Sequence, residues 1–163
     1  MFTTNRISGF LTTILVLASD LWSKQSVLSW FYHGSESIEV TSFLNIILAF
    51  NRGVSFGMFH ADSPYGVYAL LTIAIVLSAL VGNWLWHAEN RLQSLCFGMI
   101  LGGALGNLYD RATYGAVVDF LDVHALGYHW YTFNIADCGI VIGAVLLLID
   151  LVFLTKKEET SND

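Results

Sequence analysis

Four long apolar segments constrain the fold of this chain more than any other feature. A transmembrane helix needs about 20 mostly apolar residues, and four segments approach that length: residues 7–28, 65–87, 92–111 and 135–154. The composition agrees, because 55% of the 163 residues are hydrophobic and 12% are charged, against about 25% charged residues in soluble domains. We therefore predict one all-α membrane domain, residues 1–163, with four transmembrane helices.

The lysines and arginines indicate which way the chain faces in a membrane. Cytoplasmic loops of membrane proteins are enriched in these residues. With an even number of spans, four of the cations fall on one side: Arg6, Arg91, Lys156 and Lys157. We therefore expect both termini and the 87–92 turn in the cytoplasm, with the loops 30–64 and 112–134 on the outer side.

The loop between the first two spans is predicted to hold a small β-sheet. Its apolar residues partly alternate and are β-formers: Ile38, Val40, Phe43, Ile46, Leu48 and Phe50. We expect two or three short strands at the outer membrane surface, leading into Asn51-Arg52-Gly53 and a Phe-rich stretch at 54–59. Such an element is suited to hold an extended substrate or a lipid chain.

The first segment allows two interpretations. Arg6, the apolar run and Ala18-Ser19 fit the pattern of a cleaved signal peptide. Against cleavage, the helix-compatible pattern continues beyond that point, and Asp20 and Lys24 lie four residues apart on one helical face. We favour an uncleaved first span in which Asp20 and Lys24 form an ion pair.

Two aspartates near the outer interface are candidates for catalysis. Asp119 lies in the apolar stretch 117–121, and Asp137 lies where the fourth span begins. The loop between them is long enough to fold back and bring them together. Two adjacent carboxylates share one proton, so that one activates water while the other polarises a peptide carbonyl. This chemistry needs neither metal nor cofactor, and none is predicted.

Asn134 indicates how the two aspartates divide their roles. A helix N-cap at Asn134 places Asp137 at the third helical position, where the helix dipole and free N–H groups favour an ionised carboxylate. Asp119 lacks that help. We therefore predict Asp137 as the base and Asp119 as the resting acid. The alternative for any single aspartate is a structural ion pair or a helix cap.

Other kinds of site find little support in the sequence. The five histidines show no metal-ligand spacing, and no H-E-x-x-H pattern occurs. Two cysteines imply no disulfide framework, and a net charge of −6 without a basic patch argues against nucleic-acid binding. Glycines spaced four residues apart indicate close helix packing in lipid: Gly98, Gly102, Gly106, Gly139 and Gly143.

Five short blocks along about residues 20–143 carry a family resemblance. They are Asp20-x-x-x-Lys24, Asn51-Arg52-Gly53 with Phe56-Gly57, Gly102-Gly103-x-x-Gly106-Asn107-x-x-Asp110-Arg111, Val117-Val118-Asp119-Phe120, and Phe133-Asn134-x-Ala136-Asp137. In order and spacing these blocks resemble the bacterial lipoprotein signal peptidases (signal peptidase II).

The resemblance implies an inner-membrane aspartic endopeptidase with four spans. Its substrates would be prolipoproteins, cut just before a cysteine that carries a diacylglyceryl group. The resemblance implies Asp119 and Asp137 as catalytic residues. It implies substrate-binding or site-shaping positions at Asn51, Arg52, Gly53, Asn107, Arg111 and Asn134, and supporting polar positions at Asp20, Lys24 and Asp110. We expect a monomer in contact with membrane lipid.

Two other functions stay open on the residues alone. A proton-coupled carrier would be expected to place charges at mid-depth and to show repeat symmetry, and neither is visible. In a non-catalytic assembly factor, the aspartates and arginines would serve only as structural ties.

Overall fold

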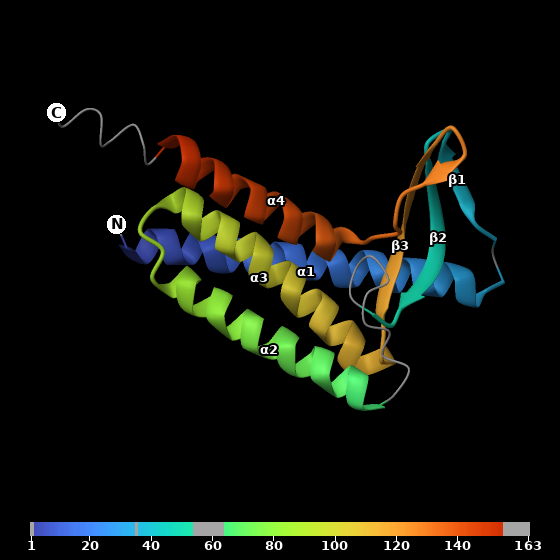
Figure 1. Ribbon diagram of the computed structural model, residues 1–163, viewed down its shortest axis with the longest axis horizontal. Helices are drawn as coiled ribbons and strands as arrows, with labels where there is room; N and C mark the ends of the chain where they lie inside the picture. Colours follow the sequence, from blue (N-terminus) through green and yellow to red (C-terminus); the bar gives the residue numbers. More distant parts are fainter. Residues whose placement is uncertain (1, 35, 54–63, 155–163) are drawn as a thin grey trace.

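The computed structural model describes residues 2–34, 36–53 and 64–154, so the predicted Phe-rich stretch at 54–59 lies outside the described residues. The elements in chain order are α1 (Phe2–Tyr32), β1 (Ile38–Thr41), β2 (Leu44–Asn51), α2 (Pro64–Trp86), α3 (Arg91–Tyr114), β3 (Val117–Ala125), β4 (Tyr128–His129), α4 (Ile135–Ile149) and a π-helical turn η1 (Asp150–Leu154). Figure 1 shows the helices running lengthwise and the strands gathered at one end. The start of α1 and the end of α4 lie at the opposite end.

Asparagine caps and one glycine fix the ends of two helices. Asn90 Oδ1 accepts the N–H of Gln93 at 2.9 Å at the start of α3, and Asn134 caps α4 in the same way. α3 ends at Gly115, whose φ of 69° is one that glycine adopts without strain. α1 and α3 extend beyond their predicted spans, because an apolar pattern marks the part of a helix that faces lipid and not its ends.

α3 is the central helix, and α1, α2 and α4 each pack against it. Glycines make this contact close. A Cβ added at Gly102 would lie 2.7 Å from the carbonyl oxygen of Thr13 on α1, and one at Gly143 would lie 2.7 Å from that of Cys96 on α3. Small residues at such crossings are how helices associate in lipid. The packing role predicted from the glycine spacing is therefore present.

The predicted all-α class needs correction, because the structure contains a four-stranded antiparallel sheet in the order β1-β2-β3-β4. β1 and β2 come from the loop where strands were predicted. β3 and β4 come from the segment 112–134, which was predicted as a loop. The apolar run at 117–121 is too short to identify a strand by periodicity, and its partner β2 lies far earlier in the chain, with Ala49 opposite Asp119 and Asn51 opposite Val117.

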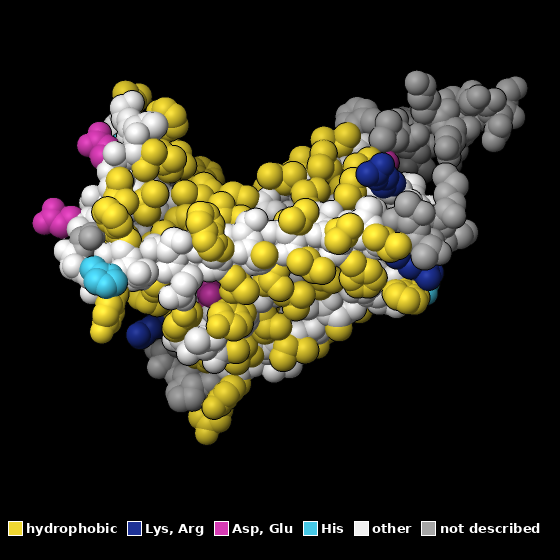
Figure 2. Space-filling view, turned by 180° about the vertical axis from the view of Figure 1, so that it is seen from behind, with side chains coloured by type: hydrophobic (Ala, Val, Ile, Leu, Met, Phe, Trp, Pro, Cys, Tyr) yellow, Lys and Arg dark blue, Asp and Glu magenta, His cyan; other side chains and the backbone are white. Residues whose placement is uncertain are grey.

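Three of the described helices are long and apolar enough to cross a membrane: Tyr65–Trp86, Arg91–Tyr114 and Ile135–Val152. α1, predicted as a fourth span, is not among them. Its Asp20 and Lys24 are nevertheless buried inside the bundle, with exposed fractions of 0% and 2%. Figure 2 shows apolar side chains along the helices, with most charged side chains in view lying toward the two ends.

Candidate active site

Asp119 and Asp137 come together where the sheet meets the helices. Asp119 lies on β3 and is only 3% exposed, while Asp137 lies in the first turn of α4. Asn134 contacts both carboxylates. Its Nδ2 donates to Asp119 Oδ1 at 2.6 Å, and its backbone N–H donates to Asp137 Oδ2 at 3.3 Å. One residue therefore holds the two aspartates beside each other, and we call them the aspartate pair.

The same asparagine forms the N-cap of α4. Asn134 Oδ1 accepts the backbone N–H of Asp137 at 3.0 Å, and the Asp137 carboxylate accepts the N–H of Asn134, which together make a capping box. The predicted N-cap, with Asp137 at the third helical position, is confirmed. The hydrogen bonds that start α4 are thus also hydrogen bonds of the aspartate pair.

Two further asparagines donate to the aspartate pair. Asn51, at the end of β2, donates from Nδ2 to Asp119 Oδ2 at 3.0 Å. Asn107, on α3, donates from Nδ2 to Asp137 Oδ1 at 2.8 Å. The pair is therefore held from β2, α3 and the start of α4, three elements that are far apart in sequence.

All three asparagine side chains are oriented by a donor at their oxygen. Asn51 Oδ1 accepts the Gly53 N–H at 3.0 Å, Asn134 Oδ1 accepts the Asp137 N–H, and Asn107 Oδ1 faces Lys24 Nζ at 3.1 Å. An asparagine amide has one accepting end and one donating end. A fixed donor at the oxygen therefore turns each NH2 group toward a carboxylate, which stabilises negative charge on the aspartate pair.

Lys24 is the buried cation behind the site. Its Nζ lies 2.7 Å from Asp20 Oδ2 and 2.8 Å from Asp110 Oδ2, in addition to its contact with Asn107. The predicted ion pair of Asp20 with Lys24 is present. The second partner, Asp110, was not predicted, because nothing in the sequence brings α1 and α3 into register. A buried lysine is tolerated when charged partners surround it in this way.

The two carboxylates bound to Lys24 each hold the backbone next to one member of the aspartate pair. Asp20 Oδ1 accepts the N–H of Ala136 at 2.8 Å, and Asp110 Oδ2 accepts the N–H of Val118 at 3.0 Å. Ala136 directly precedes Asp137, and Val118 directly precedes Asp119. Lys24 therefore ties together the two chain segments that carry the pair.

The two arginines predicted for the site differ in their contacts. Arg111 on α3 donates from Nη2 to the carbonyl oxygen of Gly53 at 3.2 Å, which fixes the end of β2 against α3 and keeps Asn51 in place. Arg52 is exposed. Within the described part of the chain, no hydrogen bond links its side chain to either aspartate. The structure thus assembles the predicted site residues with the exception of Arg52.

The surroundings of Asp119 favour its protonated form. Burial raises the pKa of this carboxyl most, the nearby charge of Asp137 raises it further, and hydrogen bonds from Asn51 and Asn134 oppose the change. The result is a pKa of about 6 in place of the ordinary 3.8. A buried carboxyl beside a second carboxylate is the arrangement in which one proton is shared.

The alternatives to an aspartate site are a metal centre and a serine nucleophile. Within residues 2–34, 36–53 and 64–154, no group of three or more His, Cys, Asp or Glu is arranged to hold a metal ion. Residues 53–57 read G-V-S-F-G, the spacing of a serine nucleophile turn, and Ser55 lies outside the described residues. The serine alternative therefore calls for an experimental control.

Comparison with known proteins places the chain in a family. The profile described as signal peptidase (SPase) II matches residues 12–153. The chain belongs to the signal peptidase II family. It is 39% identical to the lipoprotein signal peptidase of Methylocella silvestris over 95% of this chain and 91% of that protein. It is 44% identical to the lipoprotein signal peptidase of Ralstonia nicotianae over 84% of this chain and 79% of that one.

A solved membrane enzyme shares the fold of this chain. A bacterial membrane enzyme determined by the in meso method at 2.3 Å resolution superposes with a TM-score of 0.76 at 28% identity, covering 95% of this chain and 90% of that chain. The fold described above, a helical membrane protein with a small antiparallel sheet, is therefore shared with a solved membrane enzyme. The sequence resemblance to the lipoprotein signal peptidases is confirmed.

Proposed function

We propose that the protein is an aspartic endopeptidase that removes the signal peptide from diacylglyceryl-modified prolipoproteins, cutting just before the lipidated cysteine. Membership of the signal peptidase II family supports action on prolipoproteins. The observation that supports aspartic chemistry is the pair of hydrogen bonds from Asn134, one to Asp119 and one to Asp137. Two carboxylates held by one residue are suited to share a proton across a peptide bond.

The surroundings of the two aspartates support different roles for them. The raised pKa of Asp119 favours its protonated form, which makes it the acid. Asp137 sits in the first turn of α4 and receives hydrogen bonds from Asn107 Nδ2 and the Asn134 backbone, which makes it the base.

The reaction follows from these roles. Asp137 takes a proton from water as the water oxygen bonds to the carbonyl carbon before the lipidated cysteine, and Asp119 gives its proton to the carbonyl oxygen. In the second step the C–N bond breaks. Asp137 then returns its proton to the leaving amine, and Asp119 recovers one from the hydroxyl as the acid product forms. Each aspartate ends in its starting state.

The membrane arrangement is part of the proposal. α1 serves as the fourth span, because inside the bundle its Lys24 is paired with Asp20 on the same helix and with Asp110 on α3. With four spans, both termini lie in the cytoplasm of a bacterial inner membrane and the aspartate pair lies near the outer interface. We propose a single-domain monomer that contacts membrane lipid.

The test uses purified protein and a diacylated prolipoprotein substrate. D137N should abolish cleavage because the base is lost, whereas S55A should cleave at the wild-type rate because no serine takes part. Circular dichroism and thermal unfolding establish that both variants fold. Full processing by a folded D119N/D137N variant would rule out the aspartic mechanism, and loss of cleavage in S55A alone would indicate a serine enzyme.

A further inference from the structure

The strand that carries Asp119 has one apolar side and one polar side. Successive residues of a strand point to opposite sides of the sheet. Asp119 therefore shares its side of β3 with Leu121 and Val123. The other side carries Asp122 and His124 at the same distance along the strand. The side chains that follow Asp119 on its own side of the strand are thus uncharged.

Neighbouring strands widen this apolar side. Directly opposed residues of antiparallel strands lie on the same side of a sheet. On β2, Ile46 lies opposite Leu121. In the segment that continues β4, the N–H of Trp130 donates to the carbonyl oxygen of Val123 at 2.7 Å. With their neighbours in register, these residues form what we call the apolar face: Leu44, Ile46, Leu121, Val123, Tyr128 and Trp130.

An irregularity in β2 keeps the apolar face continuous up to Asp119. Ile46 opposes Leu121 and Ala49 opposes Asp119, so three steps along β2 match two steps along β3. In a regular strand, residues three apart would point to opposite sides, and the extra residue of a bulge restores the same side. Ala49 carries only a methyl group, so no large side chain of β2 separates Asp119 from the apolar face.

The apolar face becomes more exposed with distance from the aspartate pair. Asp119 is 3% exposed and Leu121 is half-buried. Val123, Trp130 and Tyr128 are 36%, 65% and 84% exposed. Asp119 and Val123 are separated by about 13 Å along the strand. Figure 1 shows the turns of the sheet extending past the start of α4. A group that begins at Asp119 can therefore follow β3 outward without meeting a charged side chain.

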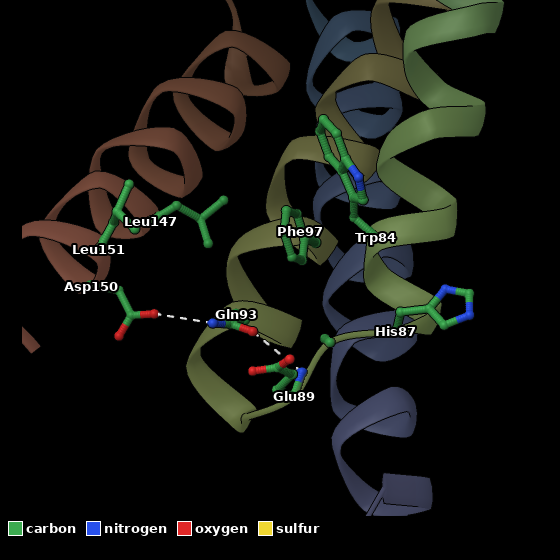
Figure 3. Close-up of a pocket in the computed structure, with 9 residues that line it drawn as sticks. Trp84, His87, Glu89, Gln93, Phe97, Leu147, Asp150 and Leu151 are labelled. Carbon is green, nitrogen blue, oxygen red and sulfur yellow. Dashed lines mark hydrogen bonds between the residues drawn. The ribbon is translucent and has the colours of Figure 1, made fainter. Parts of the chain in front are cut away.

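Hollows elsewhere in the described chain are less well placed for such a group. One of about 420 Å³ lies at the other end of the bundle, and Figure 3 shows Leu147 at its edge, with the imidazole of His87 pointing away. Leu147 is about 15 Å from Asp137 along α4. Another, of about 330 Å³, lies between α1 and α3 and reaches Lys24 and Asp110. Neither hollow is lined by a member of the aspartate pair.

We propose that the apolar face binds an acyl chain of the diacylglyceryl group on the substrate's cysteine. The proposal deepens the proposed function and rests on it. In that reaction the lipidated cysteine directly follows the scissile bond, so its acyl chains begin beside the aspartate pair. The apolar core of the signal peptide lies before the bond, and the cysteine therefore leaves the site in the other direction.

The chemistry and the length of an acyl chain both match the apolar face. An acyl chain carries no charge, and its burial against apolar side chains is favourable, whereas the other side of the sheet presents Asp122 and His129. Acyl chains of one leaflet fill half of a hydrocarbon core that is about 30 Å thick. A reach of about 15 Å from Asp119 brings the end of the chain to Val123 and Trp130.

The first measurement locates the chain without requiring cleavage. Full-length D137N, in an uncharged detergent, is mixed with a diacylated prolipoprotein peptide whose acyl chains end in a photoactivated diazirine. After illumination, mass spectrometry identifies the labelled residues. The label should fall on Val123, Tyr128 and Trp130, and excess unlabelled diacylated peptide should suppress it. Label on α2 and α4 in place of the sheet would overturn the proposal. Equal suppression by phospholipid would assign the face to membrane lipid and would overturn it as well.

The second measurement compares V123S/W130S with the wild type on substrates that carry either palmitoyl or octanoyl chains. V123S/W130S should raise the KM for the palmitoyl substrate about tenfold, because two apolar contacts are lost. The kcat, and the KM for the octanoyl substrate, should stay within about twofold, since a shorter chain contacts these residues less. F50S is the matched control, because Phe50 is 49% exposed and, opposite Val118, lies on the other side of the sheet.

The kinetic outcomes separate this proposal from the proposed function. Thermal unfolding establishes that V123S/W130S and F50S fold. An unchanged KM for the palmitoyl substrate in V123S/W130S would overturn the assignment of the apolar face. An equal rise in F50S, or an equal rise for both substrates, would also overturn it. In each of these cases the wild type still cleaves and the proposed function stands. A wild type that cleaves neither substrate would instead refute the proposed function.

Discussion

Two aspartates on one strand have pKa values that are shifted in opposite directions. Asp119 and Asp122 lie three residues apart on β3, and both are almost fully buried, with 3% and 4% of their surface exposed. Burial raises the pKa of both. Yet the pKa of Asp119 rises to about 6, whereas that of Asp122 falls below the ordinary value.

The partners account for the difference. Asp119 faces the charge of Asp137, which adds to the effect of burial. Asp122 lies 2.8 Å from His129 Nδ1 and accepts a hydrogen bond from Asn45 at 3.1 Å, and these contacts outweigh burial. Residues an odd number apart on a strand point to opposite faces. One strand therefore carries, on opposite faces, a carboxyl whose pKa is raised and a carboxylate whose pKa is lowered.

The largest expected effect compares the two positions directly. D119N should lower kcat by about 10³-fold or more, because an amide cannot give a proton to the substrate carbonyl. D122N should keep kcat within about twofold, because Asp122 takes no part in the reaction. Both rates are measured on the diacylated substrate with the folded fraction determined in parallel. A comparable loss of kcat in the two folded variants would contradict the different roles assigned to Asp119 and Asp122.

Lys24 pairs with Asp110, and Asp110 accepts the N–H of Val118, the residue before Asp119 on β3. K24M should destabilise the protein by about 3–5 kcal/mol, because Asp20 and Asp110 are left as buried charges without a cation. Thermal unfolding in detergent measures this. The variant D20N/K24M/D110N should recover much of the stability, since no uncompensated charge remains, but cleavage should stay impaired because Asn107 Oδ1 has lost its charged donor and keeps only Asn134 Nδ2. Recovery of both would show that Lys24 has no positioning role.

The third prediction concerns the pH dependence of cleavage. The acid Asp119 loses its proton as the pH rises above about 6, so kcat/KM should fall on the alkaline side. N51A removes a hydrogen bond that lowers the pKa of Asp119. Its alkaline limb should therefore move to higher pH, by up to about one unit. Asn45, which donates to Asp122 instead, provides the control, and N45A should leave the limb unchanged. A shift to lower pH in N51A would contradict this assignment of the proton.

The smallest effect is expected at Asp122. Because its folded pKa lies below the ordinary 3.8, the native state binds fewer protons than the unfolded state around that pH. The stabilisation is therefore present at neutral pH and is lost as the pH falls through the folded pKa. D122N should cost about 1 kcal/mol or less at pH 7 and close to nothing in strong acid. Chemical unfolding at both pH values measures the difference, and an equal cost at both would refute the linkage.

The sequence predicted the parts of the molecule that depend on local pattern. The apolar segments indicated α2, α3 and α4, and the Asn134 cap followed from residues three apart. β3 was not predicted, because its apolar run is short and because its partner β2 is separated from it in the sequence by α2 and α3. α1 was harder to classify, since the ion pair that places Asp20 and Lys24 inside the bundle also lowers its hydropathy.

The sequence predicted which residues form the candidate site, but not the contacts between them. Asp119, Asp137 and the asparagines were named from the motif blocks, whereas their geometry depends on long-range contacts. The contact of Asp110 with Lys24, and the hold of Asp20 on Ala136, join helices that are distant in sequence. No spacing along the chain encodes such contacts, so a single sequence cannot predict them.

The buried cation on α1 has a consequence for the biogenesis of the protein. During synthesis the ribosome releases α1 first, and Lys24 then has Asp20 as its partner; Asp110 follows with α3, and the backbone N–H of Ala136 follows with α4. The aspartate pair forms only when this last segment has docked. Under the proposed aspartic mechanism, an incompletely inserted chain would therefore be proteolytically inactive.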